Sequence, residues 1–458
     1  MEFIILAVFV LGYVFIALEH TFHIDKAATA LLTGTICWGL FVTGTDVPAE
    51  HLEEAFKLFS SEHGDGHVPL LSGFFEHRLL HHMEEISSIL FFLMGAMTIV
   101  ELVDAHEGFA VITDRIRTTN KVKLLWVLSL LTFFFSAVLD NLTTSIVMIS
   151  LLRKLIDDKE TRWLFAGLVV VSANAGGAWS PIGDVTTTML WIGGQQSTGV
   201  IVSHLFLPSL VALLVPLGVL SFTMKGEVTR PRVVDEHAGD PTSPAERNLV
   251  FTLGVAGLLF VPVFKTVTHL PPFMGMMLSL GVMWVVTELM HRSKNQEERK
   301  DLSVLGVLRK IDTASVLFFL GILLAVASLQ EAGMLLAAAG WLSETMGNVY
   351  AINVIIGLLS AIVDNVPLVA ASMGMYDIAP AATEAGSFAH FFVRDGIFWQ
   401  FLAFCAGTGG SALIIGSAAG VAVMGLERID FVWYLKKISL LALLGYFAGA
   451  GTYWLMFH

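Results

Sequence analysis

The chain has 458 residues, of which 55% are hydrophobic and 14% are charged, and its mean hydropathy is +0.75. Apolar runs of about 17–25 residues, long enough to cross a bilayer, recur from end to end, and no soluble core could bury them all. The net charge of −13 argues against nucleic acid as a partner. These properties predict an all-α integral membrane protein surrounded by the lipid bilayer, and they exclude a soluble protein of two or more domains.

The first 85 residues contain apolar runs followed by a polar segment. The run Phe3–Leu18 lacks the basic residues that precede a cleaved signal peptide, so we expect it to remain as a helix. In the segment 45–85 histidines are mixed with acidic residues. We interpret this segment as a solvated extracytoplasmic loop; because histidine titrates near neutrality, a pH sensor is the alternative.

The apolar stretch 124–152 is basic at both ends. Lys123 precedes it and Arg153 follows it, and because basic loops stay in the cytoplasm, both ends should face that side. Asp140 and Asn141 lie near its middle. The pattern predicts a re-entrant hairpin with this polar pair at its tip, and a single tilted helix with a buried polar pair is the alternative.

Residues 172–188 are too rich in glycine, proline and hydroxyl side chains to remain helical throughout. They predict an unwound stretch inside a membrane crossing, where free backbone carbonyls can contact an ion. Residues 407–417 have a similar composition and are the expected counterpart.

Three sequence blocks occur twice, in the same order and at nearly the same spacing. The blocks are Phe91–Leu93 and Phe318–Leu320, Ser136–Asn141 and Ser360–Asn365, and Asn174–Gly177 and Thr408–Gly410. They predict two related halves, residues 1–223 and 248–458, joined by a cytoplasmic linker at residues 224–247. A second hairpin at 349–375 has acidic flanks and should open to the outside. The halves are therefore expected to be inverted repeats of five crossings each, each with a hairpin and a broken helix, and with both chain termini extracytoplasmic.

Three carboxylates, those of Asp140, Asp184 and Asp364, lie deep in apolar segments that contain no lysine or arginine. An ionised aspartate at bilayer depth costs about 2.5–3.5 kcal/mol. A bound cation is the expected partner, with a proton as its substitute; a structural aspartate bonded to nearby backbone is the alternative. Thr143 and Thr144 follow the first aspartate, and such oxygen atoms suit a hard cation.

The tip Asp140-Asn141 and the run Asn174–Thr187 resemble those of the NhaD-type sodium/proton antiporters, and the resemblance covers essentially the whole chain. These antiporters belong to a superfamily of ion transporters that includes arsenite and silicon efflux proteins and divalent-anion/sodium symporters. The resemblance implies that the protein is a transporter and not an enzyme. It would exchange Na⁺, and also Li⁺, for H⁺ by an elevator-like alternating-access mechanism, and it would need no cofactor. It also implies a homodimer with scaffold and transport domains, in a bacterial inner (plasma) membrane.

Carried over position by position, the resemblance implies a set of residues that bind sodium or the proton. These are Asp140, Asn141, Asn174, Asp184, Thr186 and Thr187 in the first half and Ser360, Asp364, Asn365, Thr408 and Ser411 in the second. The three aspartates, with Asn141 and Asn365, are the implied Na⁺ ligands. We expect Asp140 and Asp184 to lie close together, because the first hairpin tip must meet the unwound run of its own half.

The second half departs from the first at Ser417, which stands where the first half has Asp184. We therefore expect two unequal ion sites. Two other functions within the superfamily remain open, namely sodium-coupled anion symport and efflux of arsenite or silicic acid. The symporters carry Ser-Asn-Thr at the hairpin tips, whereas the negative charge of Asp140 disfavours an anion. The efflux proteins usually carry asparagine at the position of Asp184.

Overall fold

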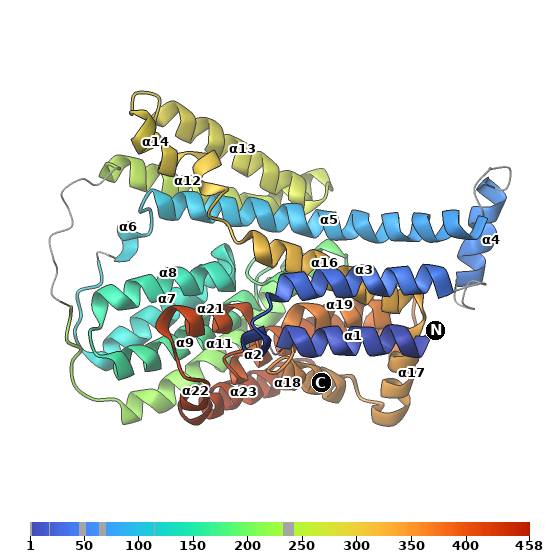
Figure 1. Ribbon diagram of the computed structural model, residues 1–458. Helices are drawn as coiled ribbons and strands as arrows, with labels where there is room; N and C mark the ends of the chain where they lie inside the picture. The colour runs from blue at the N-terminus through green and yellow to red at the C-terminus, as the bar shows by residue number, and fades with distance from the viewer. Residues whose placement is uncertain (1, 18, 45–51, 64–69, 114, 232–241) are drawn as a thin grey trace. The chain divides into compact units, whose positions relative to one another are not determined.

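The computed structural model describes residues 2–17, 19–44, 52–63, 70–113, 115–231 and 242–458. In these ranges the chain is almost entirely helical (Figure 1), and extended backbone pairs only in two isolated bridges, Asn120 with Glu227 and Ala379 with Val393. Eight of the described helices are long and apolar enough to cross a membrane, or up to nine if one bent pair is counted as a single crossing. The prediction of an all-α integral membrane protein is confirmed.

Along the sequence the helices fall into two sets, one before and one after the segment that joins α11 to α12. The first set is α1 (Glu2–Ala17), α2 (Glu19–Phe22), α3 (Lys26–Gly44), α4 (Glu53–His63), α5 (Leu70–Ala105), α6 (Ala110–Thr113), α7 (Lys121–Leu139), α8 (Asn141–Leu155), α9 (Lys159–Gly177), α10 (Val185–Ile192) and α11 (Thr198–Thr223). The second set is α12 (Pro244–Thr268), α13 (Pro272–Met290), α14 (Gln296–Leu302), α15 (Val304–Val307), α16 (Thr313–Glu331), α17 (Met334–Met346), α18 (Val349–Leu359), α19 (Asn365–Met375), α20 (Ile397–Gly409), α21 (Ala418–Glu427), α22 (Phe431–Lys437) and α23 (Ser439–Phe457). Two 3₁₀ turns, η2 (Phe388–Phe392) and η3 (Gly410–Ala412), flank α20.

The described chain forms two compact units, and each contains segments from both predicted halves. The first unit comprises Met1–Leu90, Asp312–Ile352 and Val366–Ile378; the second comprises Phe91–Ile311, Asn353–Asn365 and Ala379–His458. Within the first unit α3 packs along α1 and α16. Compact packing therefore does not follow the sequence repeats, and the division into repeats at 1–223 and 248–458 stays a prediction.

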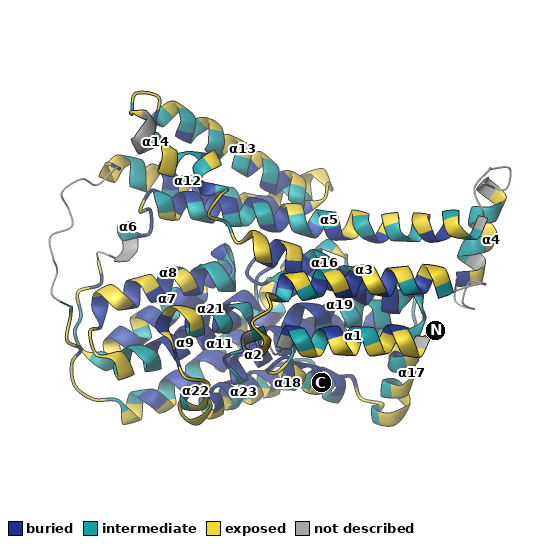
Figure 2. Cartoon of the chain, in the orientation of Figure 1, coloured by how far each residue is buried: buried dark blue, intermediate teal, exposed yellow. Residues whose placement is uncertain are grey.

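The second unit is built around two helices that are buried along most of their length. Every residue of α9 from Phe165 to Gly177 is buried, and so is every residue of α20 from Phe398 to Gly409. Helices α7, α8 and α11 pack around α9, and Figure 2 colours buried residues dark blue. Small residues in these helices let neighbouring backbones approach closely, which favours helix packing within a membrane.

Glycines at the breaks after α9 and α20 lie so close to the backbone of α7 and of α18 with its following turn that any side chain there would collide with a carbonyl. The matching pairs are Gly176 with Phe133 and Gly183 with Ser136 in the first half, and Gly409 with Gly357 and Gly416 with Ser360 in the second. Because only glycine permits this approach, the contacts tie α7 to the break after α9 and the end of α18 to the break after α20. The shared sequence blocks thus correspond to shared contacts.

Each predicted hairpin region consists of two helices with an aspartate directly before the second. α7 ends at Leu139 and α8 begins at Asn141, so the alternative of one continuous helix over 124–152 is wrong. Asp364 stands in the same way before α19. Helix α17, which precedes α18 and is bent from it by 119°, was not predicted from the sequence.

The breaks in the two buried helices are shorter than the predicted unwound runs. Within 172–188 only residues 178–184 are non-helical, and within 407–417 the α-helix continues to Gly409 and a 3₁₀ turn follows. The glycine-rich ends of α9 and α20 stay helical because they are buried among neighbouring helices, and packing overrides their low helix propensity.

Most described residues of the segment 45–85 are helical, which corrects the expectation of a loop, and a few of their side chains are buried. Residues 45–51 and 64–69 lie outside the described residues, whereas α4 and the start of α5 are helical. His82 is 6% exposed, and its Nε2 lies 2.7 Å from Oε1 of Glu331. Arg78 donates to both oxygens of the same carboxylate. Because of their polar composition, the first turns of this long helix were predicted as a loop.

Candidate functional site

Asp140 joins α7 to α8 in an unusual backbone conformation. Its φ of 76° and ψ of 161° lie in a region used almost only by glycine, where another residue costs about 1–3 kcal/mol. Its carboxylate caps α8, because Oδ1 accepts from the Thr143 amide at 2.8 Å and Oδ2 from the Thr143 hydroxyl at 2.7 Å. Glycine would make this turn without strain, so the strain indicates that the carboxylate itself has a function.

Asp184 lies at the break between α9 and α10 and is 1% exposed. It caps α10, because its Oδ1 accepts from the amide and from the hydroxyl of Thr186, both at 2.9 Å. Ser417 caps α21 with nearly the same backbone angles, φ −147° and ψ 153°, against −147° and 144° for Asp184. The two breaks are alike in backbone, but only the first presents a carboxylate.

The Asp184 carboxylate receives amide groups from the first residues of α8 and α19. Asn141 Nδ2 donates to Oδ2 at 2.8 Å, and Asn365 Nδ2 lies 3.5 Å from each carboxylate oxygen. Asp140 and Asp364 directly precede these asparagines and so lie in the same region. The structure therefore brings residues of both halves to one carboxylate.

Asn174 extends this network into the second half of the chain. Its Oδ1 accepts from Asn141 Nδ2 at 3.1 Å, and its Nδ2 donates to the hydroxyls of Ser411 and Ser417 at 3.0 and 2.9 Å. Because Asn141 donates to both Asn174 and Asp184, a chain of buried hydrogen bonds runs from Asp184 to Ser417.

The hydroxyls of four other predicted residues do not point at the Asp184 carboxylate. Ser360 and Thr408 donate to backbone carbonyls of α20, and Thr187 donates to the Asp184 carbonyl at 2.9 Å. Thr144 Oγ1 is buried and makes no hydrogen bond. Of the four, Thr144 alone has a hydroxyl that makes no hydrogen bond.

The partners of the Asp184 carboxylate are neutral. Neither Asp140 nor Asp184 forms an ion pair with any residue that the structure describes. A Cβ atom placed at Gly407 would lie 3.7 Å from Asp184 Oδ2, so the absence of a side chain there leaves room beside the carboxylate. The arrangement can therefore accept a small cation or a proton.

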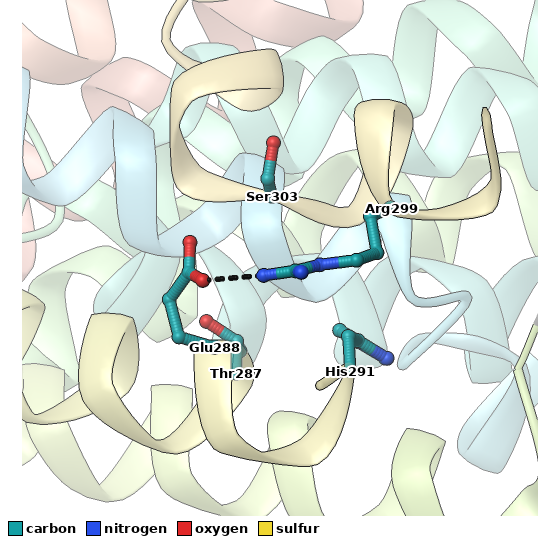
Figure 3. A pocket seen from close by; sticks show the side chains of 5 residues that line it. All are labelled: Thr287, Glu288, His291, Arg299 and Ser303. Atoms are coloured by element: carbon teal, nitrogen blue, oxygen red, sulfur yellow. Dashed lines mark hydrogen bonds and ion pairs between the residues drawn. The ribbon is translucent and has the colours of Figure 1, made fainter. Parts of the chain in front are cut away.

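A small pocket in the second unit lies apart from these residues. Its lining residues are Thr287, Glu288, His291, Arg299 and Ser303. Figure 3 shows Arg299 reaching Glu288, to which it donates at 2.8 Å. His291 Nε2 lies 2.7 Å from His106 Nε2, and burial, with the nearby Lys294 ammonium, lowers the pKa of His291 to about 4. This region is a neutral histidine contact and contains no predicted ion ligand.

Two buried or membrane-embedded charges have specific partners that were not predicted from the sequence. Lys265 lies within α12 and donates to the Trp191 carbonyl of α10 at 2.6 Å. Glu427, at the end of α21, pairs with Arg153 and Arg162 at 2.7 Å each. A charged residue in or beside an apolar run was the available signal, but its partner could not be read from the sequence.

Comparisons with known proteins give a consistent set of relatives. The profile of the citrate transporter family, CitMHS, matches residues 13–391. Sodium/proton antiporter 1 of Arabidopsis thaliana is 53% identical over 377 residues, which are 82% of this chain and 63% of that protein. Sodium/proton antiporter 2 of the same plant is 45% identical over 449 residues, 97% of each chain. The Na(+)/H(+) antiporter NhaD of Vibrio parahaemolyticus is 30% identical over 391 residues, 80% of this chain and 89% of that protein.

Proposed function

The chain belongs to the citrate transporter family, with NhaD-type antiporters among its relatives, and we propose that it exchanges Na⁺ for H⁺ across the membrane. The observation that carries the proposal is the buried Asp184 carboxylate, which is contacted by Asn141 and Asn365 from the two hairpin tips. All its donors are neutral. A negative charge therefore remains at the site for a cation to neutralise.

Na⁺ and H⁺ are alternative partners of such a carboxylate. An uncompensated aspartate at membrane depth costs about 2.5–3.5 kcal/mol, and either ion removes this cost. Charge attraction is much stronger in a low-dielectric site than in water, and the neighbouring Asp140 and Asp364 add to it. Binding of one ion therefore favours release of the other. Exchange follows if the site, when occupied by Na⁺ or a proton, becomes accessible from the opposite side of the membrane.

We place one principal ion centre at Asp184, in place of the two unequal sites that the sequence suggested. Asn365 brings the second hairpin to Asp184, and Ser417, the counterpart of Asp184, is engaged with Asn174. The free hydroxyl oxygen of Thr144 is a candidate further ligand, because hard cations prefer oxygen ligands.

The proposed cycle is alternating access of the elevator type, within a homodimer. Li⁺ is a second proposed substrate, since it is also a small monovalent cation that prefers oxygen ligands. The basic loops are proposed to be cytoplasmic, with both termini on the opposite side. The relatives occur in a plant as well as in bacteria, so the bacterial inner membrane is one of the locations to be tested.

Sodium-coupled anion transport is the second candidate, because the family profile is described as that of a citrate transporter. Citrate is a polyanion and requires cationic partners. Among the described residues no lysine or arginine is paired with Asp184, Asn141 or Asn365, and the aspartates would repel it. The geometry therefore favours a cation.

The test uses everted membrane vesicles that contain the protein, a preformed proton gradient and a pH-sensitive dye. Addition of Na⁺ or Li⁺ should collapse the gradient at some point between about pH 6 and pH 10. Asp184→Asn removes the charge and keeps the size, and this variant should not respond. Failure of the wild type to respond to either ion rejects the antiport proposal, and Na⁺-dependent uptake of labelled citrate would support the second candidate.

A further inference from the structure

The half-helix α10 carries the central carboxylate at its first residue but is itself short. It has 8 residues, Val185–Ile192, and Asp184 is its N-cap. A helix of this length is not stable by itself, so its direction depends on what holds its far end. Whatever fixes that end also fixes the position of the Asp184 carboxylate.

Lys265 holds the far end of α10. Its Nζ donates to the Trp191 carbonyl at 2.6 Å and lies 4.3 Å from the centre of the Trp191 ring. Trp191 is only 1% exposed. A positive charge is favourable at the C-terminus of a helix, where carbonyls lack partners within the helix, and a charged donor strengthens the hydrogen bond.

The direction of the Lys265 side chain is informative. Lys265 lies three residues before the end of α12 and is the helix's only charged residue after Arg247, in a place where a lysine can usually extend along the helix to reach the polar surface of the membrane. Here its ammonium group turns to a buried tryptophan of another helix instead. Solvation of the ammonium group alone does not account for this side-chain direction.

The other half-helix, α21, is held in a matching way. Its N-cap Ser417 receives Asn174, and its last residue Glu427 is held by Arg153 and Arg162. The groups that hold α21 come from the first half of the chain, and Lys265 and Asn365, which contact α10 and its cap, come from the second half. Each half-helix thus has basic side chains of the opposite half at its C-terminal end.

We propose that Lys265 is a positioning residue for the ion site, which it acts on through α10. The proposal rests on the proposed binding of Na⁺ at Asp184. Without Lys265 the end of α10 has more freedom, so Asp184 meets Asn141 and Asn365 in its binding geometry for a smaller fraction of the time. Apparent Na⁺ affinity should fall, whereas the rate with saturating Na⁺ should change little.

The experiment measures the Na⁺ dependence of exchange in everted vesicles for wild type, Lys265→Met and Lys265→Arg. Lys265→Met should raise KM for Na⁺ on the order of tenfold. Loss of the charged hydrogen bond is expected to weaken Na⁺ binding by about 1.4 kcal/mol, which corresponds to a tenfold lower affinity. Lys265→Arg should restore most of the affinity, since arginine keeps the charge, the N–H donors and the ring contact. The matched control is Lys26→Met, which removes a lysine of the first unit that lies 4.9 Å from the Phe318 ring centre; its KM should equal that of wild type.

A second measurement separates positioning from support of the fold. In detergent, bound Na⁺ should raise the melting temperature of the purified protein, and Lys265→Met should shift the half-saturating Na⁺ concentration by the same factor as KM. A lower melting temperature with an unchanged Na⁺ midpoint would overturn the proposal. If Lys265→Met does not accumulate, Lys265→Gln, which keeps a donor but not the charge, replaces it, and a wild-type KM in that variant would likewise overturn the proposal. If the wild-type protein responds to Na⁺ in neither measurement, the proposed function is rejected, and the proposed role of Lys265 is rejected with it.

Discussion

Replacing Asp140 by glycine should separate stability from transport. The φ of 76° and ψ of 161° at Asp140 cost about 1–3 kcal/mol for a residue with a side chain, and glycine removes that cost. The change also removes the cap on the Thr143 amide, which costs only a few tenths of a kcal/mol when glycine replaces aspartate. The net effect should be a gain of about 0.5–2.5 kcal/mol in the free energy of unfolding, together with loss of Na⁺/H⁺ exchange.

The assay compares thermal unfolding in detergent with exchange in vesicles for wild type, Asp140→Gly and Asp140→Asn. Asparagine removes the charge but keeps the strained backbone and most of the side-chain shape, so the glycine variant should be the more stable of the two, and both should be inactive. A glycine variant that is clearly less stable than wild type would refute the strain argument. One that exchanges ions at the wild-type rate would remove Asp140 from the site.

Two further predictions concern the space beside the ion centre and the histidine contact. Gly407→Ala places a methyl group 3.7 Å from Asp184 Oδ2 without a backbone collision, so the protein should fold and its KM for Na⁺ should rise on the order of tenfold; Gly176→Ala, which collides with a carbonyl of α7, should prevent accumulation of folded protein. Because the pKa of His291 is lowered to about 4, the unfolded chain binds a proton at this residue between about pH 6.5 and pH 4 that the folded chain does not. As the pH is lowered through that window, the free energy of unfolding should decrease by at most about 1.4 kcal/mol per pH unit. His291→Gln should make this pH dependence less steep, whereas the change of the exposed His81 to glutamine should not. A wild-type KM in Gly407→Ala, or an unchanged pH slope in His291→Gln, would contradict the respective argument.

Local sequence was sufficient to find the residues at which the helices break. Asp140 and Asp364 stand in apolar runs, each followed by asparagine and each preceded by a similar block. Their cost at membrane depth makes a polar environment necessary. Such signals lie within a few residues of the feature that they predict, so they could be read directly.

The pairing of these residues could not be read in the same way. The contact of Asn365 with Asp184 joins positions far apart in the chain, and it depends on how two hairpins and a broken helix pack. The partner of Lys265 is a backbone carbonyl, which leaves no trace in the side-chain sequence. Packing also kept the glycine-rich end of α9 helical to Gly177, against the local propensity of those residues.

The central claim is that Na⁺ and H⁺ compete for the Asp184 carboxylate, and proton release on Na⁺ binding tests it most directly. NaCl is added to the purified protein in weakly buffered detergent solution while the pH is recorded, with choline chloride as the control salt. The account predicts that the wild type releases protons in a saturable manner as Na⁺ binds, and that Asp184→Asn releases none. Saturable Na⁺ binding by the wild type without proton release, or equal release from Asp184→Asn, would contradict it.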